Sequence, residues 1–182
     1  MNRRTDRRST RKNKFTPEQA PQSAEEYFRL SPEVQDQWNR VTHAVTKMRT
    51  DGISVQEAER QFGLAPGTVA HIAGTALRKN KKRQFVARAS DSLLRVLVLP
   101  TPEGLSEIAL RDSRQASLVG EYWAAVQKYL ETGESSPLHR FAGMHVTGED
   151  GKEISLLTDL DELDRLGSAG VLSFESLYAR SA

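Results

Sequence analysis

The sequence predicts an α+β fold, in which a trihelical unit at about residues 24–80 precedes a small mixed module of hairpins and helices at residues 91–182. Apolar residues recur at helical spacing through the first half, a pattern typical of helices with one buried face. In the second half, short β-branched and leucine-rich runs alternate with turns that contain glycine and proline, a pattern that indicates hairpins. A basic linker is expected between the two, at residues 81–90.

The N-terminal segment, residues 1–23, is predicted to be a disordered basic arm. It is rich in arginine, serine, threonine, proline and glutamine, and Phe15 is its only aromatic residue. Such a segment buries too little apolar surface to offset the entropy that is lost on ordering. Tyr27, Phe28 and Leu30 come next and are expected to pack on the first long helix.

This first helix is predicted to start after Ser31, an N-cap residue that precedes Pro32 at the first helical position. Gly52 is suited to a left-handed cap at its end. Between Ser31 and Gly52, apolar residues recur at alternating spacings of four and three positions, which predicts a helix with one buried face. The residues of this face are Val34, Trp38, Val41, Val45 and Met48.

A second helix is predicted after Ser54, because Ser54 and Glu57 have the spacing of a capping box. Gly63 permits a tight turn after this short helix. Pro66 then starts a third helix that is expected to continue to Leu77. The inward face of this third helix is expected to contain Val69, Ile72, Ala73, Ala76 and Leu77.

The second half is predicted to open with a hairpin whose strands are residues 93–99 and 105–110. A long helix with a buried aromatic and aliphatic face is expected at about residues 112–131, ended by Gly133. A second hairpin and a short helix capped by Asp159 follow. The last helical turn is indicated by Phe174, Leu177 and Tyr178.

Composition excludes several classes of protein. With no cysteine among its 182 residues, the chain has no disulfide, thiolate nucleophile or cysteine-ligated zinc site. No apolar stretch approaches the roughly 20 residues that a membrane helix needs, and no apolar segment follows the N-terminal arginines as it would in a secretory signal. The sequence therefore predicts a cytoplasmic protein with no membrane partner.

Charge is concentrated in two segments. Residues 1–14 and 78–88 each have a formal charge of +6, which leaves −10 for the rest of a chain whose net charge is +2. Two basic patches on an otherwise acidic protein are typical of polyanion binding. A solvated linker and a solubilising tail are the alternative interpretations of the two patches.

Residues 53–77 resemble the helix-turn-helix superfamily, and within it the short DNA-binding modules of resolvases, invertases and transposon-encoded proteins. The resemblance is carried by a small residue, a glycine turn and apolar residues that hold two helices together. The matching positions are Ala58, Phe62, Gly63, Leu64, Thr68, Val69 and Ile72. Family members direct the N-terminal end of the second of these helices into the major groove, so the resemblance implies a recognition helix at Pro66–Leu77.

The predicted nucleic-acid contacts come from this helix, the basic run behind it and the arm. Arginines of the arm are expected either to enter a minor groove or to remain a flexible tail, whereas the basic run is expected to contact phosphates. The residues of the helix and the run are Thr68, His71, Thr75, Arg78, Lys79, Lys81, Lys82 and Arg83. The residues of the arm are Arg3, Arg4, Arg7 and Arg8.

The sequence departs from the family pattern at two points. Glu59 stands where the family usually has alanine, so either the two helices splay or the Glu59 side chain is pushed outward. The outward face of the predicted third helix has no arginine, asparagine or glutamine to read bases. Packing against another helix is therefore an alternative use of this helix.

Taken together, the patterns predict a duplex-DNA-binding regulator of transcription or of a mobile element, without a cofactor or a catalytic site. None of the four histidines has the spacing of a metal site. A homodimer would supply two half-sites and so raise the specificity of a single short helix. The alternatives are a protein associated with structured RNA or the ribosome, and a protein–protein adaptor.

Overall fold

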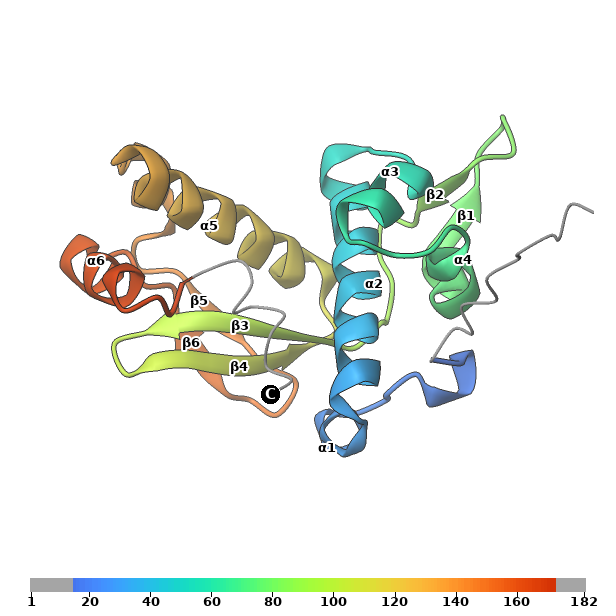
Figure 1. The fold of residues 1–182 in the computed structure, drawn as a ribbon, viewed down its shortest axis with the longest axis horizontal. Helices are drawn as coiled ribbons and strands as arrows, with labels where there is room; N and C mark the ends of the chain where they lie inside the picture. The colour runs from blue at the N-terminus through green and yellow to red at the C-terminus, as the bar shows by residue number, and fades with distance from the viewer. Residues whose placement is uncertain (1–14, 173–182) are drawn as a thin grey trace, which may run out of the picture.

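The computed structural model describes residues 15–172, so the arm arginines Arg3, Arg4, Arg7 and Arg8 and the expected turn at residues 174–178 lie outside the described residues. The fold is α+β, as predicted (Figure 1). The helices are α1 (Ala24–Arg29), α2 (Pro32–Asp51), α3 (Val55–Gln61), α4 (Thr68–Ile72), α5 (Ser113–Thr132) and α6 (Leu160–Ser168). The strands are β1 (Leu77–Lys79), β2 (Phe85–Ala87), β3 (Arg95–Thr101), β4 (Gly104–Leu110), β5 (His145–Thr147) and β6 (Glu153–Ser155).

Local signals in the sequence account for the ends of α2 and α3. Pro32 is the first residue of α2, and Gly52 ends the helix in the left-handed region with a φ of 66°. Ser54 caps α3, because its Oγ accepts a hydrogen bond from the Glu57 backbone N–H at 3.2 Å. The predicted boundaries of these two helices are confirmed.

The third helix is much shorter than predicted. α4 contains only five residues, because it begins after Gly67 rather than at Pro66 and ends at Ile72 rather than at Leu77. A short 3-10 helix (Gly74–Ala76) leads directly into β1, which pairs antiparallel with β2. The predictions of a continuous helix to Leu77 and of a linker at residues 81–90 are therefore wrong, and a β-hairpin occupies this part of the chain.

The burial predicted for this segment is nevertheless correct. The five residues expected to face inward, all exposed by 5% or less, are Val69, Ile72, Ala73, Ala76 and Leu77. Apolar periodicity indicates which positions are buried, but a helix followed by a 3-10 turn and a strand can bury the same positions. The predicted helix does not continue to Leu77, because Leu77 pairs with Ala87 in the antiparallel β1–β2 hairpin.

The second half has the predicted order of elements. β3 and β4 form one hairpin, with Leu97 opposite Ile108, and β5 and β6 form the other. α5 begins after Asp112, whose side chain accepts a hydrogen bond from the backbone of Arg114, and ends at Gly133 with a φ of 74°. α6 is capped by Asp159, as expected. These predictions are confirmed.

Two hydrophobic cores meet at β3, which contacts both α2 and α5 (Figure 1). Val96 of β3 belongs to the core around α2, whereas Leu97 and Leu99 belong to the core around α5. Leu94 also belongs to the first core, and its carbonyl accepts a hydrogen bond from Trp38 Nε1 at 2.9 Å. The predicted start of a second module at residue 91 therefore lies inside the segment that completes the first core.

The last part of the predicted arm, residues 15–23, packs on α2. Phe15 is fully buried, and its ring stacks on Trp38 with 5.5 Å between ring centroids. A 3-10 helix (Pro17–Gln19) and the α1 cap residue Ser23 follow. The prediction of disorder is wrong for these residues, because a single aromatic side chain finds a site on a neighbouring helix.

Candidate nucleic-acid interface

The β1–β2 hairpin projects away from the helices of the N-terminal half (Figure 1). Arg78 and Lys79 of β1 lie opposite Val86 and Phe85 of β2. The tip between the two strands contains Lys81, Lys82 and Arg83. Five of the predicted nucleic-acid-binding residues therefore lie on one hairpin rather than at the end of a helix.

Asn80 determines the conformation of the hairpin tip. Its Oδ1 accepts hydrogen bonds from the backbone N–H groups of Lys82 at 2.9 Å and Gln84 at 3.0 Å. Arg83 has a φ of 60°, in the left-handed region that a tight turn requires. Because the turn is already ordered by these bonds, less conformational entropy is lost when its cations contact a partner.

The cations of the hairpin are exposed and free of carboxylates. Arg78, Lys79, Lys81, Lys82 and Arg83 are all classed as exposed, and within residues 15–172 none of them forms an ion pair. The Nζ atom of Lys79 lies 5.4 Å from the centroid of the Phe85 ring, at cation–π distance. Positive charge on this surface is therefore not neutralised within the described chain.

Arginine side chains join the base of the hairpin to the helices. Arg88, just after β2, donates its backbone N–H to the Ala76 carbonyl at 2.8 Å and its Nε–H to the Leu77 carbonyl at 3.2 Å. Arg49 of α2 donates its Nε–H to the Arg88 carbonyl at 2.8 Å. The Arg88 bonds close the base of the hairpin on the 3-10 turn and β1, and the Arg49 bond attaches this base to α2.

A buried ion pair lies directly behind this attachment. Both guanidinium nitrogens of Arg95 bond to the Asp91 carboxylate, at 2.8 and 2.9 Å, and Arg49 bonds to the same carboxylate. Arg95 also donates to Thr46 Oγ1 at 3.1 Å. Burial acts to raise the pKa of Asp91, but the hydrogen bonds from Arg95 and the charges of the two arginines outweigh it and lower the pKa.

The predicted contacts on α4 and the following 3-10 turn differ in exposure. His71 and Thr75 are exposed, whereas Thr68 is only 1% exposed and faces the core. Thr68 is therefore a correction to the predicted contact set, since its side chain is not available to a partner. Thr68 lies one helical turn before Ile72, on the buried side of α4 with Val69 and Ile72.

Glu59 explains how α3 and α4 fit together. Its side chain is not pushed outward but is 3% exposed, and its carboxylate accepts hydrogen bonds from the backbone N–H groups of Gly67 at 3.1 Å and Val69 at 3.0 Å. This carboxylate therefore satisfies the free amides at the start of α4. A phosphate cannot use the same amides, so phosphate contact has to come from elsewhere.

Sequence reasoning missed two residues of this surface, Asn80 and Phe85. Phe85 is 38% exposed, which is unusual for a large apolar side chain, and it lies on the strand opposite Lys79. A run of basic residues interrupted by Asn80 and followed by Phe85 and Val86 is a signal for a hairpin with a polar tip. The strength of the helical period just before it masked this signal.

Two kinds of feature are absent from residues 15–172. This part of the chain has no group of three or more histidine, aspartate or glutamate side chains that could hold a metal ion. The helices of the same range include none whose length and apolar content would allow it to cross a bilayer. Comparison of the chain with family models, with curated proteins and with solved structures gives no match.

Proposed function

We propose that this protein binds duplex DNA through the β1–β2 hairpin and the exposed side of α4, as a regulator of transcription or of a mobile element. The observation that carries the proposal is a set of five exposed cations without ion-pair partners in residues 15–172, on a hairpin that is hydrogen-bonded to the helical unit. When such cations contact phosphates, counterions condensed on the DNA are released, which favours binding at low salt.

Contacts to the phosphate backbone supply most of the affinity in this proposal. The exposed residues of α4 and the 3-10 turn include His71 and Thr75 but no arginine, asparagine or glutamine that could make a bidentate base contact. Backbone contacts position a protein on DNA without selecting a sequence. Assembly as a homodimer would add specificity by pairing two half-sites.

Binding to structured RNA is the second candidate, and the exposed ring of Phe85 favours it. An aromatic ring flanked by a cation, here Lys79 at 5.4 Å, is a surface on which an unpaired base can stack. Duplex DNA has no unpaired base to offer. The two candidates therefore differ in what they require of Phe85.

The first experiment compares two triple variants with equal changes of charge. Lys81→Ala/Lys82→Ala/Arg83→Ala removes the hairpin tip, and Arg114→Ala/Lys128→Ala/Arg140→Ala removes three exposed cations from the other half of the chain. Fluorescence anisotropy with a labelled 30-base-pair duplex, repeated over a range of salt concentrations, measures affinity and its salt slope. The proposal expects the hairpin variant to lose up to about 2.7 units of slope, at about 0.9 per phosphate contact. Equal effects of the two variants would contradict it.

A competition experiment separates DNA from RNA. Unlabelled duplex DNA should displace the labelled duplex at lower concentration than an RNA stem-loop of equal length, and Phe85→Ala should leave duplex binding within about twofold. If the stem-loop competes better and Phe85→Ala weakens it by tenfold or more, the RNA candidate replaces the DNA proposal. A base stacked on an aromatic ring contributes about 1–3 kcal/mol, and a tenfold loss, about 1.4 kcal/mol, lies within this range.

A further inference from the structure

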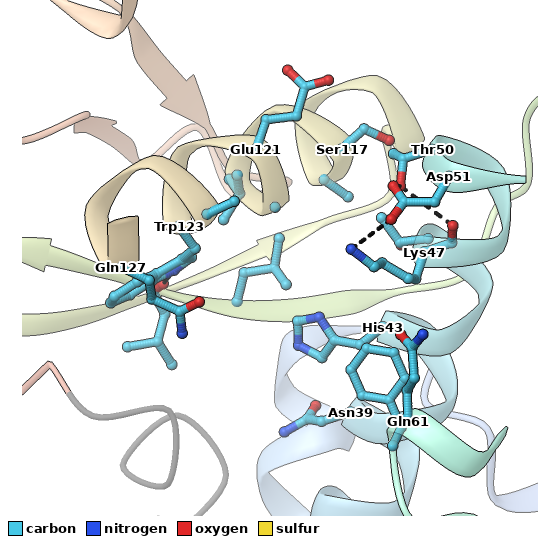
Figure 2. Close-up of a pocket in the computed structure, with 18 of the residues that line it drawn as sticks. Asn39, His43, Lys47, Thr50, Asp51, Gln61, Ser117, Glu121, Trp123 and Gln127 are labelled. Carbon is cyan, nitrogen blue, oxygen red and sulfur yellow. Dashed lines mark hydrogen bonds and ion pairs between the residues drawn. The ribbon is translucent and has the colours of Figure 1, made fainter. Parts of the chain in front are cut away.

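A pocket of about 450 Å³ lies between α2 and α5 (Figure 2). Residues of β3, among them Leu97 and Val98, form its floor. Its walls are formed by side chains of α2 and α5 and by Gln61 and Phe62 at the end of α3. Cavities of this size, with a mainly apolar lining and a few polar groups, are typical of sites for small molecules. The pocket contains none of the predicted nucleic-acid contacts.

Two flat aromatic groups line opposite walls. Trp123 of α5 is held in place because its indole Nε1–H donates to the Val98 carbonyl at 2.8 Å. On the α2 side, the His43 ring stacks on Phe62 with an interplanar angle of 18°. Figure 2 shows Trp123 and His43 on the α5 and α2 sides of the pocket. Walls of this kind favour a planar ligand, since ring stacking depends on parallel or edge contact between flat groups.

The charges at the pocket are already compensated. Lys47 forms an ion pair with Asp51 at 2.6 Å, and Glu121 forms one with Arg140 at 2.5 Å. His43 is neutral at physiological pH, because burial and, less strongly, the charge of Arg95 lower its pKa to about 4. A strongly charged ligand would lose its hydration here without gaining a counter-charge.

The polar groups that remain are neutral amides. Asn39, Gln61 and Gln127 line the pocket. Asn39 Nδ2 already donates to the Tyr27 hydroxyl at 2.7 Å and Gln61 Nε2 to the Glu57 carboxylate at 3.1 Å. Each of these two amides keeps a second N–H and its oxygen for further hydrogen bonds. Figure 2 shows them around the edge rather than on the floor. A ligand that fits this arrangement has an apolar face and uncharged donors or acceptors on its rim.

The α5 wall is kept open by Gly120. A Cβ atom added at this residue would meet nothing within 4 Å, so neither crowding nor backbone conformation requires glycine here. Glycine in a helix interior is less stable than alanine, and its absence of a side chain leaves the space of the pocket unfilled. A larger residue at this position would therefore project into the cavity.

We propose that the pocket between α2 and α5 binds an uncharged, planar small molecule, with its rings between Trp123 and His43 and its polar rim on the amides of Asn39, Gln61 and Gln127. This proposal does not depend on the proposed nucleic-acid function, because the pocket shares no residue with the predicted contacts and ligand binding is measured without nucleic acid. The probe for the test is 2-naphthamide, compared with 2-naphthoate and 2-naphthylmethylammonium, which have the same rings and opposite charges.

The readout is fluorine NMR of the full-length protein labelled with 5-fluorotryptophan. The chain has two tryptophans, so one resonance reports on the pocket and the other, from Trp38 in the first core, is an internal control. The Trp123 resonance should shift in a saturable way with 2-naphthamide while the Trp38 resonance stays constant. Binding of the two charged probes should be at least tenfold weaker.

Matched variants locate the binding. Gly120→Ala adds one methyl group and should keep binding within about threefold, whereas Gly120→Leu should fill the pocket and abolish the shift. Ala124→Leu, at an exposed position of the same wall, gives the same test should Gly120→Leu fail to fold. The proposal is overturned if 2-naphthamide causes no saturable shift of Trp123, if the filled variants bind as the wild type does, or if a charged probe binds more tightly.

Discussion

Arg83 precedes β2 in the sequence and Arg95 follows it. Their guanidinium groups differ in exposure and in ion pairing. Arg83 is exposed at the hairpin tip and has no ion-pair partner within residues 15–172. Arg95 is 1% exposed and bonds through two nitrogens to Asp91. The difference shows that the role of a cation between residues 78 and 95 depends on whether the fold brings a carboxylate within reach, and not on the number of basic residues around it.

This difference divides the charged residues into two groups with different effects on stability. An exposed cation loses little hydration on folding and contributes little to the free energy of unfolding. A buried ion pair is costly to disrupt, because removal of one partner leaves the other charged and desolvated. Variants in the two groups should therefore separate stability from binding.

The largest effect is expected from Asp91→Ala. Loss of this carboxylate leaves Arg95 and Arg49 close together and without their counter-charge. The free energy of unfolding, measured by urea denaturation, should fall by about 3–5 kcal/mol. Glu149→Ala, which breaks the half-exposed pair with Arg111, is the matched control and should cost less than about 1 kcal/mol. Similar losses in the two variants would remove the distinction between the two groups.

The next largest effect is a pH dependence that comes from His43. Burial lowers its folded-state pKa from 6.5 to about 4, so the unfolded chain binds the proton more readily and stability is lost as pH falls through this interval. Between pH 7 and pH 5 the loss should be about 2 kcal/mol. Urea denaturation of His43→Gln should show a correspondingly flatter profile. The lowered pKa of Asp91 acts only at lower pH, below the ordinary range of a carboxylate. An unchanged profile in His43→Gln would show that another group dominates.

A smaller effect is expected from Glu59→Ala. The variant leaves the N–H groups of Gly67 and Val69 without their acceptor, which should lower the free energy of unfolding by about 1–2 kcal/mol. Glu59→Gln keeps an oxygen acceptor and should lose less. Glu103→Ala, in the exposed β3–β4 turn, controls for removal of an acidic residue. A full-sized loss in Glu103→Ala would count against a capping role for Glu59.

The hairpin tip should give the smallest effect on stability. Lys81→Ala/Lys82→Ala/Arg83→Ala removes three exposed side chains and should change the free energy of unfolding by no more than about 0.5 kcal/mol. The same variant is expected to weaken nucleic-acid binding most. A large loss of stability would mean that these cations have intramolecular partners, and the contrast with Arg95 would then disappear.

Elements with local signals were predictable from the sequence. Gly52 and Gly133 end their helices in the left-handed region, and Ser54 and Asp159 cap theirs, because each signal depends only on residues a few positions away. The order of hairpins and helices after residue 90 follows from the same kind of signal. Buried and exposed faces were predictable for a similar reason.

Features that depend on distant partners were not predictable. The stacking of Phe15 on Trp38 orders residues that have no apolar pattern of their own. The β1–β2 hairpin was missed for a different reason, because the helical period before it masked its local signal. The capping role of Glu59 also depends on a helix beyond the next turn. Of the predicted contacts, those on the hairpin and His71 and Thr75 are exposed, whereas Thr68 lies on the buried side of α4 with Val69 and Ile72.

The sharing of β3 between the two cores has a consequence for dividing the chain. A fragment that stopped at Ser90 would lack Leu94 and Val96, so the first core would lose two buried side chains and Trp38 would lose the acceptor of its indole N–H. A fragment that started there would expose Val96 on a strand most of whose other residues are buried. The helical unit therefore cannot be transplanted as an autonomous module, and a chimera that borrows the hairpin surface has to carry β3 and its partner strand with it.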